Sequence, residues 1–218
     1  SSGVPQSFDR VDDDLQAAID AMFARVSSLE KVVIWGLCDA ASAAMIYGWR
    51  DDRVGGLVLA NPWARTESGE AKALIRHYYL RRLFSAEFWR KLMTGQLEIG
   101  RAIQSLLGNV RSASAAAESS ADETDEGFLI RMEKGLDRFA GPVLLLLSGD
   151  DLTAAEFVNY SGSSSSWRGI LARKTCQKRE FPGVNHTFSS EEWRHLAARA
   201  TSEWLFDEFA DIQDLTDS

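Results

Sequence analysis

The chain alternates between short apolar runs and longer segments in which apolar residues recur every three or four positions. The short runs are continuous and bounded by turn residues, which is typical of buried strands. They lie at residues 31–35, 54–60, 143–147 and 176–181. Helical spacing is found at 12–27, 40–50, 127–139, 167–173 and from residue 189 onward, where Ser189 and Glu192 have the spacing of a capping box. Strands that alternate with helices predict an α/β fold, a parallel sheet with helices on both faces.

A long segment between the second and third predicted strands divides this pattern. Residues 66–135 are mostly helical in character and rich in aromatic residues and arginine, so we predict a lid-like insertion there. The core then consists of residues 1–65 and 136–218. Within the insertion, the acidic low-complexity stretch 112–126 predicts a flexible loop. The serine-rich run 161–166 predicts a second flexible segment.

The first predicted strand leads into a Gly-x-Cys-x-Ala motif at 36–40, followed by small residues that allow a helix to pack closely. This is the pattern of a nucleophile elbow, with Cys38 in place of the usual serine and Ala40 in place of the second glycine. Such a turn exposes one side chain above the sheet. It also directs the next backbone N–H, here that of Asp39, at the reacting carbonyl group. The motif therefore predicts a hydrolase or an acyltransferase.

Two further residues follow later strands, at the edge of the sheet where α/β proteins bind their ligands. Asp151 comes just after the third predicted strand, with Asp150 as its rival, and His186 lies in the loop after the last one. The order nucleophile, acid, histidine is that of α/β hydrolases. We therefore predict Cys38, Asp151 and His186 as a catalytic triad in which the imidazole holds the thiol as thiolate. Structural roles remain as alternatives, namely a buried thiol for Cys38 and a helix cap for Asp151.

An oxyanion hole needs a second donor, which such enzymes take from a loop after an early strand. The sequence has no predicted strand upstream of residue 31. We therefore expect the α/β-hydrolase-type sheet of this chain to lack the N-terminal strands.

Composition excludes several other classes of function. The net charge of −8 argues against a nucleic-acid partner. No apolar run reaches the ~18 residues that a membrane span requires. The two cysteines and three histidines have no metal-ligand spacing, so we expect neither metal nor cofactor. So few cysteines fit a reducing, cytoplasmic setting.

Residues 75–92 alternate large apolar with basic side chains. A helix of this composition can lie on a membrane surface as a peripheral contact, or admit an acyl chain. The alternative is a lid helix that packs on the core.

Four motifs together resemble one family. They are 36–42 (Gly-Leu-Cys-Asp-Ala-Ala-Ser), 61–63 (Asn-Pro-Trp), the aromatic and basic runs at 77–80 and 88–92, and Ser-Gly-Asp-Asp-Leu-Thr-Ala at 148–154. Over residues 1–206 the chain is similar to hydrolase 1 of the exosortase A system-associated α/β hydrolases. The resemblance implies an α/β-hydrolase fold and a Cys-His-Asp triad at Cys38, His186 and Asp151. It also implies association with bacterial exopolysaccharide and protein-sorting gene clusters, and leaves the natural substrate undefined.

The sequence thus predicts an enzyme that acts on a small-molecule ester or thioester through an acyl-enzyme. The alternative is a catalytically silent interaction module on a hydrolase scaffold, because fold alone does not fix function. The acceptor, water or another hydroxyl, and the oligomeric state are left open by the sequence.

Overall fold

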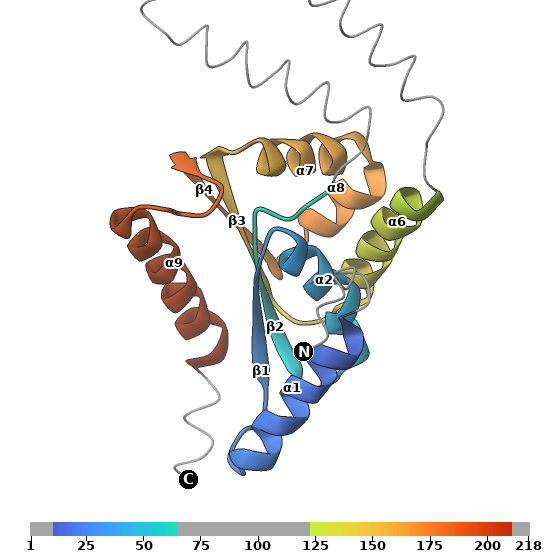
Figure 1. The fold of residues 1–218 in the computed structure, drawn as a ribbon, viewed down its shortest axis with the longest axis vertical. Helices are drawn as coiled ribbons and strands as arrows, with labels where there is room; N and C mark the ends of the chain where they lie inside the picture. Colours follow the sequence, from blue (N-terminus) through green and yellow to red (C-terminus); the bar gives the residue numbers. More distant parts are fainter. Residues whose placement is uncertain (1–10, 65–122, 211–218) are drawn as a thin grey trace, which may run out of the picture.

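The computed structural model describes residues 11–64 and 123–210, which form a layered α/β structure (Figure 1). Helices and strands alternate as the sequence predicts. In chain order the elements are α1 (Asp12–Arg25), β1 (Val32–Leu37), α2 (Asp39–Tyr47), the 3-10 turn η2 (Gly48–Arg50), β2 (Val54–Ala60), α6 (Glu123–Arg138), β3 (Val143–Asp150), α7 (Leu152–Ser163), α8 (Ser165–Leu171), β4 (Cys176–Asn185) and α9 (Glu191–Phe209).

The four strands form one parallel sheet in the order β1-β2-β3-β4. The side chains of β2 point alternately to the two faces of the sheet. Leu57 and Leu59 pack with α2 and α6 on one face, whereas Val58 and Ala60 pack with α9 on the other. Of the helices in the described residues, Figure 1 shows α9 on one side of the sheet, and α1, α2, α6 and α8 on the opposite side. Both faces of the central strands are therefore buried, which explains their continuous apolar sequence.

The predicted strands are confirmed, and three of them extend further toward their carboxyl ends. β2 has the predicted bounds, while β1 continues to Leu37, β3 to Asp150 and β4 to Asn185. β4 continues through Pro182, which an edge strand tolerates because proline lacks only the amide donor. Within the described residues no strand precedes β1, which agrees with the expectation that the N-terminal strands are missing from this sheet.

Both predicted flexible segments need correction where the structure describes them. α6 begins at Glu123, so the acidic loop predicted for 112–126 does not include its last four residues; acidic residues favour the first turn of a helix. The serine-rich run 161–166 is mostly helical. Ser161 is buried and its hydroxyl donates to the Phe157 carbonyl (2.7 Å), while Ser164 caps α8.

The helix faces differ in detail from the predicted ones. The spacing at 12–27 predicts one apolar face that includes Ile19, Met22 and Val26; Ile19 is buried, whereas Met22 in α1 and Val26, which follows the helix, are about half exposed. The cap of α9 is Ser190, whose side chain accepts a hydrogen bond from the Trp193 backbone N–H (3.2 Å), rather than Ser189. Side-chain hydrogen-bonding groups at neighbouring positions compete for one cap, and spacing alone does not decide between them.

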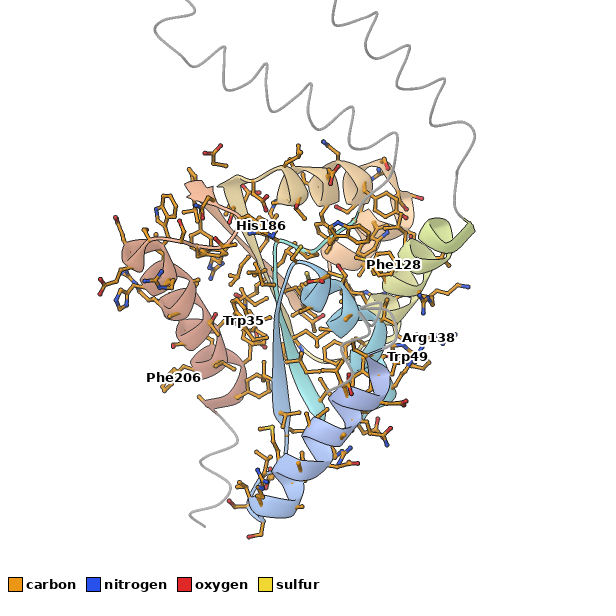
Figure 2. All side chains as sticks on the ribbon, in the orientation of Figure 1. Trp35, Trp49, Phe128, Arg138, His186 and Phe206 are labelled. Atoms are coloured by element: carbon orange, nitrogen blue, oxygen red, sulfur yellow. The ribbon has the colours of Figure 1, made fainter. Side chains whose placement is uncertain are left out.

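α6 packs closely on the core, although the predicted insertion 66–135 includes all of this helix except its last three residues. A Cβ atom on Gly135 would lie 2.2 Å from the carbonyl oxygen of Met45 in α2, so these helices touch backbone to backbone. The guanidinium of Arg138 stacks over the Trp49 ring at 4.5 Å (Figure 2). The rest of the predicted insertion lies outside the described residues, and so does the basic aromatic segment 75–92.

The helices that the structure describes include none that is both long enough and apolar enough to cross a membrane.

Candidate active site

Cys38 occupies a sharp turn between β1 and α2. Its backbone has φ 59° and ψ −122°, a conformation that side-chain-bearing residues rarely adopt. The turn is held on both sides: the Cys38 N–H donates to the Ala60 carbonyl (2.9 Å), and the Cys38 carbonyl accepts from the N–H groups of Ala41 (3.1 Å) and Ser42 (3.2 Å). A strained residue held in this way between strand and helix has the geometry of a nucleophile elbow.

Gly36 makes this turn sterically feasible. A Cβ atom at this position would lie 2.6 Å from both the Ala40 carbonyl oxygen and the Ala41 nitrogen. These are backbone atoms of the first turn of α2, and they cannot rotate away as a side chain would. The first glycine of the motif is therefore required by the close crossing of β1 and α2.

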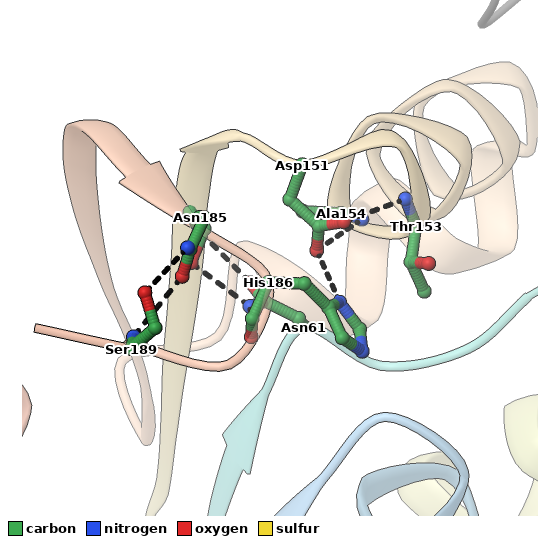
Figure 3. Close-up of polar contacts among 8 residues, drawn as sticks. Asn61, Asp151, Thr153, Ala154, Asn185, His186 and Ser189 are labelled. Carbon is green, nitrogen blue, oxygen red and sulfur yellow. Dashed lines mark hydrogen bonds and ion pairs between the residues drawn. The ribbon is translucent and has the colours of Figure 1, made fainter.

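Asp151 follows β3 directly and is buried, with 7% of its surface exposed. One carboxylate oxygen, Oδ1, accepts a hydrogen bond from the Thr153 N–H (3.1 Å). The other, Oδ2, accepts from the Ala154 N–H (3.1 Å) and lies 2.8 Å from Nδ1 of His186 (Figure 3). The carboxylate therefore caps α7 and orients the imidazole at once. A helix cap and a partner of the histidine are therefore compatible roles for Asp151. Its rival Asp150 pairs with Asn185 in the register of β3 and β4.

His186 lies in a tight turn directly after β4. The side chain of Asn185 closes this turn, because its Nδ2 donates to Oγ of Ser189 (2.7 Å) and its Oδ1 accepts from the Ser189 N–H (3.1 Å). Phe188, at φ 51°, contributes a left-handed position. Because Asp151 contacts Nδ1, Nε2 is the ring nitrogen that takes no part in this pair.

The microenvironment of Cys38 contradicts the expectation of a thiolate at rest. Burial raises the pKa of the Cys38 thiol above its ordinary value, and the negative charges of Asp39 and Asp151 raise it further. A hydrogen bond from the Asp39 backbone N–H acts in the opposite direction and is outweighed. The resting thiol is therefore protonated at neutral pH, and a nucleophilic role would require its proton to leave during attack.

Sequence reasoning missed two residues that support the site. Asn61 follows β2, is fully buried, and donates through Nδ2 to the His186 carbonyl (2.9 Å). Ser42, also fully buried, donates through its hydroxyl to the Trp63 carbonyl (2.7 Å). The signal was present in the motif at 61–63, where an asparagine between a buried strand and a proline marks a constrained turn.

The described residues hold no group of three or more His, Cys, Asp or Glu side chains arranged to bind a metal ion.

Figure 2 shows His186 at the carboxyl end of the sheet, well away from the aromatic side chains Trp35 and Phe206 near β1 and α9. The three predicted residues all lie at the edge of the sheet where the strands end: Cys38 follows β1, Asp151 follows β3, and His186 follows β4.

Solved structures similar to this one are α/β hydrolases. A monoacylglycerol lipase from Paleococcus ferrophilus aligns over 90% of this chain and 76% of its own length, with a TM-score of 0.50 and 18% identity. A proline iminopeptidase from Mycobacterium smegmatis aligns over 96% and 76%, with a TM-score of 0.53 and 14% identity. A structure from a study of two fungal esterases from Rhizomucor miehei aligns over 92% of this chain and 60% of its own length, with a TM-score of 0.51 and 15% identity.

These similarities define the class of fold: the chain has the α/β-hydrolase fold and spans 60% to 76% of the lengths of these three proteins. No protein-family model matches the sequence, and no curated protein sequence matches it either.

Proposed function

We propose that this chain belongs to a hydrolase or acyltransferase that cleaves an ester or thioester through a covalent intermediate on Cys38. The observation that carries the proposal is the His186–Asp151 pair, with Nδ1 and Oδ2 2.8 Å apart, at the same sheet edge as the strained Cys38 turn. A nucleophile on an elbow and a base oriented by a buried carboxylate are the components of acyl transfer. The similar folds of a lipase, esterases and a peptidase are consistent with this chemistry.

In the proposed reaction, Nε2 of His186 takes the proton of the Cys38 thiol while Sγ attacks the substrate carbonyl carbon. The Asp39 backbone N–H donates to the oxygen that becomes negative. The intermediate then collapses, and the imidazolium gives its proton to the departing alcohol or thiol, leaving an acyl group on Sγ. His186 next deprotonates a water or an acceptor hydroxyl, which attacks the thioester and regenerates the thiol.

Because the resting thiol is protonated, His186 acts as a general base rather than as a permanent counter-ion. Asp151 stabilises the imidazolium that forms in the attack, since its carboxylate is buried and already held by two backbone N–H groups. The resemblance to exosortase-associated hydrolases extends the proposal to a role beside bacterial exopolysaccharide and protein-sorting systems.

The test is a panel of p-nitrophenyl esters and acyl-CoA thioesters, with intact-mass detection of an acyl adduct. We expect an adduct on Cys38 in the wild type and none in Cys38→Ala, with loss of turnover. Cys176→Ala is the matched control, because burial raises the pKa of that thiol to about 11 and it lies at the opposite end of the sheet. Turnover that survives in Cys38→Ala would refute the proposal.

A catalytically silent interaction module is the second candidate, and the raised pKa of Cys38 favours it. A neutral thiol next to two carboxylates is a weak nucleophile unless its base is well placed. A wild type that forms no acyl adduct and turns over no substrate of the panel, but co-purifies with a sorting or polysaccharide enzyme, would support this candidate.

A further inference from the structure

The loop after β2 contains an asparagine whose side chain joins three separate segments. Asn61 is fully buried and its backbone has φ 44°, a left-handed conformation that asparagine tolerates better than most residues. Its Oδ1 accepts from the Ser148 N–H at the end of β3 (2.8 Å). Its Nδ2 donates both to Oγ of Ser148 (2.9 Å) and to the backbone carbonyl of His186 (2.9 Å).

We infer that Asn61 is a positioning residue that sets where the imidazole of His186 lies, an inference that rests on the proposed function. Asp151 restrains the ring of His186 through Nδ1. This contact alone does not restrain the backbone of His186, and the ring would move if that backbone moved. Asn61 fixes that backbone. Together the two contacts restrain both ends of the side chain, and Figure 3 shows them converging on His186 from different elements.

The same loop also holds the other reacting residue. The Trp63 N–H donates to the Cys38 carbonyl (3.3 Å), and the Ser42 hydroxyl in α2 donates to the Trp63 carbonyl (2.7 Å). Residues 61–63 thus contact the nucleophile's backbone at one end and the base's backbone at the other. This short loop therefore links the backbone of Cys38 to the backbone of His186, although the two residues are far apart in sequence.

Only an amide side chain fits the position of Asn61. One atom must accept from a backbone N–H, and the other must donate to a backbone carbonyl, so aspartate lacks the donor. Its carboxylate would face the His186 carbonyl, and a buried carbonyl without its donor is unfavourable. Glycine would keep the left-handed backbone but lose both side-chain contacts.

The experiment compares Asn61→Gly and Asn61→Asp with Ser148→Ala, a matched control. Ser148→Ala removes one hydrogen bond of the same buried amide but keeps the bond to His186 and the Ser148 N–H. We expect both Asn61 variants to lower kcat about 10- to 100-fold with little change in KM, because the base is displaced rather than the substrate site. Ser148→Ala should keep the wild-type kcat.

A readout independent of turnover separates this inference from the proposed function. In 15N-histidine NMR, the ring nitrogen chemical shifts and tautomer ratio of His186 should change in the Asn61 variants and not in Ser148→Ala, with the exposed His195 as an internal reference. If Asn61→Gly does not fold, Asn61→Asp, which keeps the side-chain shape, provides the test. Unchanged ring nitrogen shifts of His186 in both Asn61 variants, or an equal change in Ser148→Ala, overturn the inference even if the wild type has no turnover.

Discussion

Replacing Gly36 with alanine should disturb the elbow directly, since this residue lies where β1 crosses the start of α2. The new Cβ would meet three backbone atoms, the Ala40 oxygen and the Ala41 nitrogen at 2.6 Å and the Ala40 carbonyl carbon at 2.7 Å. Ordinary van der Waals contact begins near 3.4 Å. The first turn of α2 must therefore move away from β1 by about 0.8 Å, the difference between the two distances.

Overpacking of this kind costs typically ~1–3 kcal/mol, and we expect a value near 3 because no flexible side chain can yield. For a protein of this size, 1 kcal/mol corresponds to a change in Tm of ~2–4 °C. Gly36→Ala should therefore lower the Tm by about 6–12 °C in thermal unfolding followed by circular dichroism.

Gly169→Ala is the matched control, because no atom lies within 4 Å of the Cβ that it adds in α8. It should leave the Tm unchanged or raise it slightly, since alanine favours helix over glycine by up to ~1 kcal/mol. Equal Tm values for Gly36→Ala and the wild type would refute the argument that the crossing of β1 and α2 requires glycine.

Three further predictions concern other parts of the chain. Gly135→Ala should lower the urea midpoint of unfolding through its contact with the α2 backbone, and Gly127→Ala, in open space on the same helix, should not. Asp39→Asn should lower the pKa of Cys38, because it removes a neighbouring negative charge that raises this pKa; the pH dependence of alkylation by iodoacetamide, with the other cysteine removed, measures the change. The pKa of Asp51 is lowered from 3.8 to about 2 by the guanidinium beside it, so its contribution to stability is present above pH 3.8 and is lost as pH falls toward 2. Asp51→Asn should therefore flatten the acid limb of the unfolding free energy, and an unchanged limb would contradict this.

Local sequence pattern was sufficient for the parts of the fold that depend on neighbours in the chain. The bounds of β2 and the positions of Cys38 and Asp151 after their strands follow from apolar runs and turn residues. The serine-rich run 161–166 was misjudged because its composition is typical of linkers. Its serines instead cap one helix and bond back to the carbonyls of another.

Properties that depend on distant segments were not accessible in this way. The raised pKa of Cys38 arises mainly from burial and also from the charges of the neighbouring Asp39 and of Asp151; burial and the contribution of Asp151 depend on segments far along the chain. The contacts of Asn61 need the end of β3 and the loop after β4 to be placed beside it, across 87 and 125 residues. Spacing predicts which residues reach the edge of the sheet, but not which partner each one meets there.

The site follows from the parallel arrangement itself. Every strand of a parallel sheet ends at the same edge, so residues from the loops that follow the strands can lie close together although they are far apart in sequence. Here each of the four described strands is followed by a residue of the candidate site: Cys38, Asn61, Asp151 and His186 in order. Because neighbouring strands are hydrogen-bonded, a shift of any one of them would move its residue relative to the other three. The precision that the proposed acyl transfer demands would thus be a property of the sheet, and in our proposal Asn61 extends it to the loop that carries His186.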